Sequence, residues 1–190
     1  MTTKQQLRKE YLAKRTALTG DSYTVLNQQL LQQFKTLNFA GVTCIHIFLP
    51  MISRKEPDTQ LLINWLKATH PGIRLAYPKA DFLDFTILNF FDDVGLRLEI
   101  NAQGITEPVK GNTVDIAAID MVIVPLLVFD KRGYRVGYGK GFYDRFMAKC
   151  KPETRFIGIS LFEPVDSIED IDNYDIPLHQ CITPQKIWQF

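Results

Sequence analysis

The sequence is short of cysteine and of long apolar runs, and each shortage excludes a class of protein. Cys44, Cys150 and Cys181 are its three cysteines, and they form no C-x-x-C pair. This argues against a disulfide framework or a zinc site. No stretch reaches the ~18 apolar residues of a membrane span, and residues 1–20 lack the apolar core of a signal peptide. We therefore expect a cytoplasmic protein with reduced thiols and no membrane partner.

An excess of charge of one sign is also missing. The chain has 22 basic and 21 acidic residues, a formal net charge of +1, which gives no reason to expect nucleic acid as a partner. Any anion site must be local, and the expected partners are small molecules. The 190 residues, 46% of them apolar, fit one globular domain over 1–190. The sequence does not fix the oligomeric state, and a monomer is the working expectation.

Apolar periodicity predicts alternating helices and strands. Helices are expected over 3–18, 21–37, 59–68 and 141–149, and strands over 42–49, 73–77, 85–91, 119–128 and 155–161. The polar stretch 92–112 has turn chemistry and is expected to fold over a sheet edge. This pattern predicts a three-layer α/β fold with a mostly parallel central sheet flanked by helices.

The most apolar run, 119–128, is expected to be the centre of that sheet, because strands covered on both faces are apolar throughout. Ligands of such folds bind at the loops that follow the carboxyl ends of the strands. The loop after Val128 is therefore the first candidate for a binding site.

This loop is rich in glycine and in cations. Glycines permit positive φ, so that successive N–H groups can turn toward an anion. The glycines are Gly133, Gly137, Gly139 and Gly141, and the cations are Lys131, Arg132, Arg135, Lys140 and Arg145. Neither the P-loop nor the dinucleotide-binding pattern fits, because Tyr134 and Gly141 stand where the P-loop needs Gly and Ser or Thr. The loop predicts a non-standard phosphate cradle, and a generic Gly-rich turn is the alternative.

The same loop resembles the signature of the 5-formyltetrahydrofolate cyclo-ligase family. The resemblance is carried by Val124-Pro125, Phe129-Asp130, the run from Arg135 to Asp144, Lys4, Arg8, Glu56, Thr59, Tyr77-Pro78, Gly104-Ile105, Glu107-Pro108 and Thr183. It implies a magnesium-dependent reaction in which ATP phosphorylates the formyl oxygen, N10 attacks the activated carbon and phosphate leaves. A rigid cradle with nearby cations is compatible with phosphoryl transfer, which depends on positioning and charge stabilisation.

The resemblance also implies roles for individual residues. For ATP it implies contacts from Lys4, Arg8, Arg135, Val136, Gly137, Tyr138, Gly139, Lys140, Gly141, Phe142 and Tyr143. For the folate it implies contacts from Met51, Glu56, Tyr138, Gly139, Lys140, Gly141 and Phe142. Lys140 and Arg135 are the candidate catalytic residues, and Asp144 is the candidate Mg²⁺ ligand.

Each of these residues has a simpler alternative. Lys4 and Arg8 lie four apart, on one face of the predicted helix, and could be a solvated basic stripe that continues to Arg15. Asp144 could be a first-turn helix carboxylate, and Glu56 could be an exposed loop acid. The resemblance favours binding roles for all of them except Arg15, which stays undecided.

The sequence departs from the family pattern near its end. His179 stands where the family places a second acidic metal ligand, and imidazole is a poor ligand for Mg²⁺. Asp175 or water is expected to substitute, or else His179 is structural. Two other functions stay open: a folate or nucleotide sensor without turnover, and a sugar-phosphate or CoA-ester enzyme on a related fold.

Overall fold

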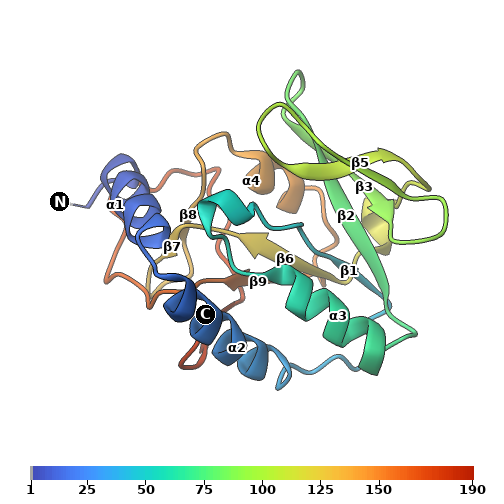
Figure 1. The fold of residues 1–190 in the computed structure, drawn as a ribbon. Coiled ribbons are helices and arrows are strands. Elements are labelled where there is room, and N and C mark those ends of the chain that lie inside the picture. The colour runs from blue at the N-terminus through green and yellow to red at the C-terminus, as the bar shows by residue number, and fades with distance from the viewer. Residues whose placement is uncertain (1) are drawn as a thin grey trace.

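Seven strands form one mixed sheet in the computed structural model, which describes residues 2–190 (Figure 1). The strand order is β11-β10-β9-β6-β1-β2-β3, and the pairing is parallel from β10 through β2 and antiparallel at both edges. These strands are β1 (Cys44–His46), β2 (Arg74–Asp81), β3 (Thr86–Phe91), β6 (Met121–Pro125), β9 (Arg155–Ile159), β10 (Gln180–Ile182) and β11 (Ile187–Gln189). The predicted α/β fold is confirmed, with β6 at the sheet's centre.

Helices cover both faces of the sheet. They are α1 (Lys4–Thr16), α2 (Gly20–Phe34), α3 (Thr59–Thr69) and α4 (Phe142–Met147), with short 3-10 turns η1 (Ile52–Arg54) and η2 (Ile116–Ala118). Because successive residues of a strand point to opposite faces, Met121 and Ile123 of β6 pack with α2 and α3, whereas Val122 and Val124 pack with α4. Burial on both faces explains why this part of the sequence is continuously apolar.

Helix α1 packs outside the main layers, over the start of the Gly-rich loop. Its Leu7 and Tyr11 lie in a separate apolar cluster with Leu127, Val128 and Val136. Thr3 caps the helix and receives a hydrogen bond from the backbone N of Gln6. The cluster therefore holds the amino-terminal helix beside the loop that follows the central strand.

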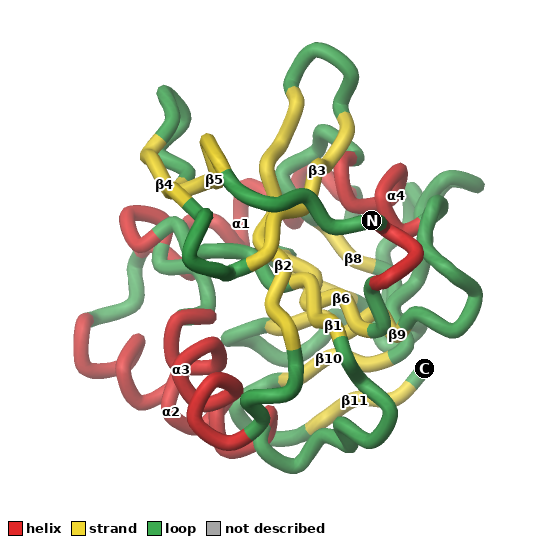
Figure 2. The backbone as a smooth tube through the Cα atoms, turned by 90° about the vertical axis from the view of Figure 1, so that its right-hand side faces the viewer, coloured by secondary structure: helices red, strands yellow, loops and turns green. Residues whose placement is uncertain are grey.

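Two small hairpins were not predicted, and both lie near the sheet's ligand-binding end. One pairs β4 (Arg97–Ile100) with β5 (Thr106–Lys110), and the other pairs β7 (Val128–Phe129) with β8 (Arg135–Val136). In Figure 2, β4 and β5 lie next to β2, and the β2–β3 hairpin projects beyond the rest of the sheet. The stretch expected to fold over an edge is therefore an ordered hairpin.

Several predicted elements are shorter than expected. The predicted strand 119–128 ends at Pro125, which has no N–H to continue a ladder. The predicted strand 42–49 keeps ladder pairing only over Cys44–His46 before the chain turns away toward Pro50. The predicted helix 141–149 spans only Phe142–Met147. In the two strands, the chain leaves the ladder at the carboxyl end of the sheet.

Candidate active site

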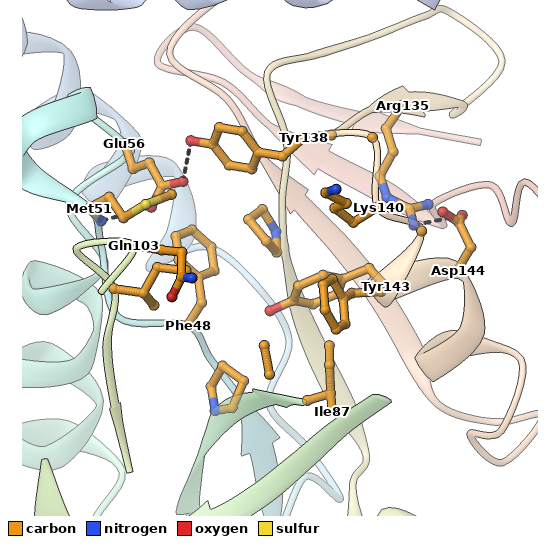
Figure 3. Close-up of a pocket in the computed structure, with 18 of the residues that line it drawn as sticks. Phe48, Met51, Glu56, Ile87, Gln103, Arg135, Tyr138, Lys140, Tyr143 and Asp144 are labelled. Atoms are coloured by element: carbon orange, nitrogen blue, oxygen red, sulfur yellow. Dashed lines mark hydrogen bonds and ion pairs between the residues drawn. The ribbon is translucent and has the colours of Figure 1, made fainter. Parts of the chain in front are cut away.

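A pocket of about 570 Å³ opens where the chain leaves the carboxyl ends of the central strands. Phe48 follows β1, Pro78 lies in the second half of β2, and Pro125 ends β6. The β2–β3 hairpin, β5, the loop after η1 and the Gly-rich loop complete the walls (Figure 3). The position agrees with the expectation for ligand sites in this fold.

Every residue that was predicted to bind ATP, folate or metal lines this pocket. From α1 come Lys4 and Arg8; from the segment after β1 come Met51 and Glu56; and from the Gly-rich loop come Arg135, Val136, Gly137, Tyr138, Gly139, Lys140, Gly141, Phe142, Tyr143 and Asp144. Segments far apart in the sequence therefore meet at one cavity. Their shared location supports the predicted roles without testing each one.

The Gly-rich loop leaves its backbone donors unused. None of the N–H groups of residues 137–141 donates a hydrogen bond to any other residue in the described range 2–190. Gly139 has φ +87° and Gly141 has φ +66°, values that glycine adopts without strain. Unused N–H groups that line a pocket beside Lys140 are typical of an anion site.

Three of the four loop glycines use the positive φ that glycine permits. These are Gly133, Gly139 and Gly141, whereas Gly137, which directly follows β8, does not have positive φ. Its carbonyl oxygen accepts a hydrogen bond of 3.0 Å from Nε of Arg8. A Cβ on Gly139 would stand 3.0 Å from Cζ of the same guanidinium. Arg8 is therefore held flat against the loop, next to its unused donors.

Arg135 and Asp144 form an ion pair at the pocket wall. Nη2 of Arg135 lies 2.8 Å from Oδ1 of Asp144, and its Nη1 donates to the carbonyl of Ile176. Burial lowers the pKa of Arg135, which the charge of Asp144 opposes. The same Oδ1 accepts a bond from the backbone N of Ile176. Asp144 therefore fixes the loop to the carboxyl-terminal segment, and only its Oδ1 is engaged in these bonds.

Lys4 of α1 meets the carboxyl-terminal segment at the pocket wall through Asp175. The two side chains are hydrogen-bonded, and Oδ2 of Asp172 lies 3.6 Å from the same ammonium. Burial alone would lower the pKa of Lys4, but the bond to Asp175 and the nearby carboxylates raise it. Both aspartates line the pocket. An acid is thus present at the end of the chain, where the sequence suggested that His179 had replaced it.

His179 lies away from the pocket and has a structural role. Its Nδ1 accepts a hydrogen bond of 2.9 Å from the backbone N of Phe156, and its ring stacks on that of Phe156. Partial burial lowers its pKa, so the neutral form is favoured. The structure therefore gives His179 a packing role and places Asp175 at the pocket, while substitution of the metal ligand by Asp175 or by water stays a prediction.

Glu56 is a buried carboxylate, not the exposed loop acid that the sequence left open. Its Oε2 accepts from the backbone N of Met51 at 2.8 Å, and its Oε1 accepts from the hydroxyl of Tyr138 at 2.6 Å (Figure 3). Burial, followed by the charge of Glu56, raises the pKa of Tyr138, which keeps the phenol protonated as a donor. The contact joins the predicted folate-binding segment directly to the Gly-rich loop.

A buried, hydrogen-bonded cluster of His46, Asn89 and Tyr143 lies beside the pocket. His46 is fully buried; its Nδ1 lies 2.6 Å from Oδ1 of Asn89, and its Nε2 lies 3.0 Å from the hydroxyl of Tyr143. Since the amide oxygen can only accept, Nδ1 carries the proton and Nε2 accepts from Tyr143. A His inside an apolar strand was the only available signal, and packing explains it equally well.

Other lining residues were not singled out from the sequence. Gln103, Thr106 and Glu107 belong to the β4–β5 hairpin, which was not predicted, whereas Ile87 lies on β3, which was. Oε2 of Glu107 is buried and has no hydrogen-bond partner among residues 2–190. A buried polar atom without a partner is costly. The presence of Glu107-Pro108 in the signature was the one clue in the sequence that this segment belongs to the site.

Only one member of the Tyr77-Pro78 pair in the family signature reaches the pocket. Pro78 lines it, whereas the hydroxyl of Tyr77 donates to Oδ2 of Asp92. Trp188 and Phe190 dock the carboxyl-terminal strand by packing on Phe129, with ring centroids 6.3 and 6.1 Å apart. Phe190 also occupies the space that a Cβ on Gly133 would need.

Within residues 2–190 there is no group of three or more His, Cys, Asp or Glu side chains arranged to hold a metal ion. A Mg²⁺ ion bound mainly through nucleotide phosphates needs only one or two protein carboxylates. Asp144 and Asp175, which both line the pocket, fit that requirement. The donor set therefore suits an ion that arrives with a nucleotide better than a resident metal.

Comparison with known sequences identifies the family of the chain. The sequence model of the 5-formyltetrahydrofolate cyclo-ligase family matches residues 1–184. The chain belongs to this family. It is similar to 5-formyltetrahydrofolate cyclo-ligase from Escherichia coli strain K12, with 29% identity over 184 residues that cover 93% of this chain and 98% of the relative.

Solved structures related to this cyclo-ligase family member have the same fold. A 5,10-methenyltetrahydrofolate synthetase from Mycoplasma pneumoniae gives a TM-score of 0.76 at 27% identity, covering 95% of this chain and 98% of the other. The NMR structure of the synthetase from Aquifex aeolicus gives 0.80 at 28% identity, covering 98% and 92%. The resemblance that the loop signature indicated is thus confirmed over nearly the whole chain, together with its assignment to an enzyme family.

Proposed function

We propose that this chain converts 5-formyltetrahydrofolate and ATP into 5,10-methenyltetrahydrofolate, ADP and phosphate. The observation that carries the proposal is a single pocket in which the Gly-rich basic loop faces the buried carboxylate of Glu56. One end offers N–H groups and cations to phosphates, and the other offers a hydrogen-bond acceptor and apolar walls to a pterin. Family membership supports the same pair of substrates.

In the first step the formyl oxygen attacks the γ-phosphorus of ATP, and the bond to the bridging oxygen breaks as ADP leaves. Lys140 and the unused N–H groups of residues 137–141 stabilise charge on the transferring phosphoryl group. Arg8, held against the loop, contributes a second cation. Arg135 acts through Asp144, since its two terminal nitrogens already hold Asp144 and Ile176.

In the second step N10 attacks the activated carbon, forming the new C–N bond. The C–O bond then breaks, and phosphate departs with the former formyl oxygen and takes up the proton that N10 loses. Glu56 accepts hydrogen bonds from pterin N–H groups and so orients the ring for this attack. Glu107 offers its unpartnered oxygen to another donor of the folate. Met51 and the segment from Tyr138 to Phe142 wall the same ligand.

Magnesium is proposed to enter with ATP and to neutralise charge on its phosphates. Asp144 and Asp175 are the residues that would hold it, directly or through water. The substrates are small molecules, and one copy of the chain supplies all the residues described for the pocket. We therefore propose that the enzyme acts as a monomeric, single-domain, cytoplasmic protein. The structure adds that no helix within residues 2–190 has the length and apolarity to span a membrane.

The decisive experiment is to follow the absorbance of the methenyl product after mixing the protein with 5-formyltetrahydrofolate, ATP and Mg²⁺. We expect an ATP-dependent rise that a chelator of Mg²⁺ abolishes. Lys140→Ala and Asp144→Ala should each lower kcat by about 100-fold or more. Lys149→Ala, which removes an exposed cation just beyond α4, is the matched control and should retain activity.

Failure would distinguish the alternatives. Tight folate binding by folded protein without product would favour the sensor. Turnover or binding of a phosphate ester without any effect of ATP would favour a sugar-phosphate or CoA-ester enzyme, a reading that family membership already disfavours.

A further inference from the structure

Arg15 is a basic residue of α1 that the proposed mechanism does not use. It shares the helix with Lys4 and Arg8, but its side chain turns inward and only 2% of the residue is exposed. It does not line the pocket. A fully buried guanidinium is costly unless it is paired and hydrogen-bonded. Its partners therefore indicate why the fold retains it.

All three nitrogens of the Arg15 guanidinium contact segments that form the pocket. Nε donates to the carbonyl of Arg54 at 2.8 Å, and Nη1 donates to the carbonyl of Leu126 at 3.3 Å. Nη2 donates to the hydroxyl oxygen of Tyr138. One side chain thus ties helix α1 to η1, to the end of the central strand and to the Gly-rich loop.

The contact with Tyr138 continues to Glu56. The Tyr138 hydroxyl accepts from Arg15 and donates its own proton to Oε1 of Glu56, at 2.6 Å. Nη2 of Arg15 also lies 3.9 Å from that oxygen, and both side chains are 3% exposed. The proton order is fixed, because a guanidinium only donates and a carboxylate only accepts. The chain of bonds therefore runs in one direction, from the cation to the carboxylate.

We propose that Arg15 is a positioning residue that holds the Glu56 carboxylate oriented toward the folate through the Tyr138 hydroxyl. Without Arg15, Glu56 would be a buried carboxylate with no cation beside it, and Tyr138 would lose the donor that fixes its hydroxyl. The effect falls on the folate end of the pocket. The phosphate end keeps Lys4, Arg8 and Lys140, and none of the hydrogen bonds of Arg15 within residues 2–190 goes to these residues. This inference rests on the proposed function.

The test compares two binding constants in the same variants. Calorimetry would measure Kd for 5-formyltetrahydrofolate alone and, separately, for ATP with Mg²⁺. In Arg15→Gln we expect the folate Kd to rise about 10-fold or more, while the ATP Kd stays within about 3-fold. Arg15→Lys keeps the positive charge but cannot donate to all three partners of the guanidinium, so it should recover part of the folate affinity. Lys9→Gln removes an exposed cation from the same helix and should change neither constant.

A double-mutant cycle separates positioning from a general structural role. If Arg15 acts through Glu56, then Arg15→Gln should cost less than about 3-fold in folate affinity when Glu56→Gln is already present. Equal losses of ATP and folate affinity, or full additivity with Glu56→Gln, would overturn the inference. If Arg15→Gln does not fold, the same comparison is made with Arg15→Lys.

Folate binding by the parent protein distinguishes failure of the proposed function from failure of the inference about Arg15. If it binds no folate, the proposed function is wrong and this inference falls with it. If it binds folate and Arg15→Gln binds equally well, only the inference is wrong.

Discussion

Gly137 and Gly139 are two positions apart in the Gly-rich loop, but only Gly139 is at a position where a side chain would be strained. Gly139 has positive φ, and a Cβ there would press on the Arg8 guanidinium. Gly137 has neither constraint, since nothing lies within 4 Å of its ideal Cβ position. Gly139→Ala should therefore lower the free energy of unfolding by roughly 1–3 kcal/mol and reduce kcat.

Gly137→Ala is the matched control for that substitution. It should fold with a stability within about 0.5 kcal/mol of the parent, since its backbone tolerates a side chain. Chemical denaturation of both variants would measure the difference. Equal stabilities would show that the left-handed conformation of Gly139 is not required by the fold.

His46 predicts how stability depends on pH. Burial lowers its pKa from 6.5 to about 4. As pH falls through this window, the unfolded chain takes up a proton that the folded chain does not, so the folded state loses stability. The loss should be on the order of 2–3 kcal/mol between pH 6.5 and 4.

The measurement is the free energy of unfolding at several pH values for the parent and for His46→Gln. Carboxylates titrate in both proteins, so the difference between the two curves isolates the histidine. The parent should fall more steeply on acidification. Parallel curves would mean that His46 titrates normally in the folded protein.

At the scale of elements, the β2–β3 hairpin adds an aromatic wall to the pocket. Phe82 at its tip packs on Phe142, with ring centroids 5.2 Å apart, and lines the pocket. It is 39% exposed, so its loss costs the free protein little. Phe82→Ser should raise the KM for folate about 5- to 20-fold, through lost apolar contact, and change stability by less than about 0.5 kcal/mol.

Leu83 is the control for the hairpin, because it is the neighbouring residue, is mostly exposed and does not line the pocket. Leu83→Ser should leave both KM and stability unchanged in steady-state kinetics and denaturation. An equal effect of the two substitutions would assign the hairpin a role other than contact with the ligand.

The elements also show what the sequence could and could not predict. The strand at 119–128 was identified because burial on both faces leaves a continuous apolar run, and the loop was identified because glycines and cations together are unusual. The hairpins β4–β5 and β7–β8 have strands of two to five residues and little alternation. Such strands are formed by tertiary contacts, which leave no periodic signal.

The same limit applied to individual residues of the site. Lys4, Arg8, Glu56 and Asp144 were found through motif resemblance, and all reach the pocket. Arg15 could not be assigned, because helical spacing gives the face of a helix but not the direction in which a long side chain turns. Glu107 was missed as a pocket residue because its segment was predicted to form turns, whereas it forms strand β5 of a hairpin.

At the scale of the molecule, the pocket joins most of the segments that surround the sheet, so ligands should stabilise the fold as a whole. At 100 times its Kd, each ligand contributes about 2.7 kcal/mol. For a chain of this length, this corresponds to a rise in Tm of roughly 5–10 °C. Thermal unfolding with 5-formyltetrahydrofolate would measure it, with Glu56→Gln as the variant that should respond less at the same concentration. A parent that shows no rise at saturation would contradict the proposed binding.

The bond between Lys4 and Asp175 has a consequence for synthesis of the protein, since 171 positions separate its partners. A nascent chain that lacks Asp175 can already contain the phosphate loop and the central strand, but it lacks one wall of the cavity. A ligand that depends on this wall, such as a nucleotide whose Mg²⁺ is held by Asp175, can therefore stabilise the fold fully only after residue 175 has been made.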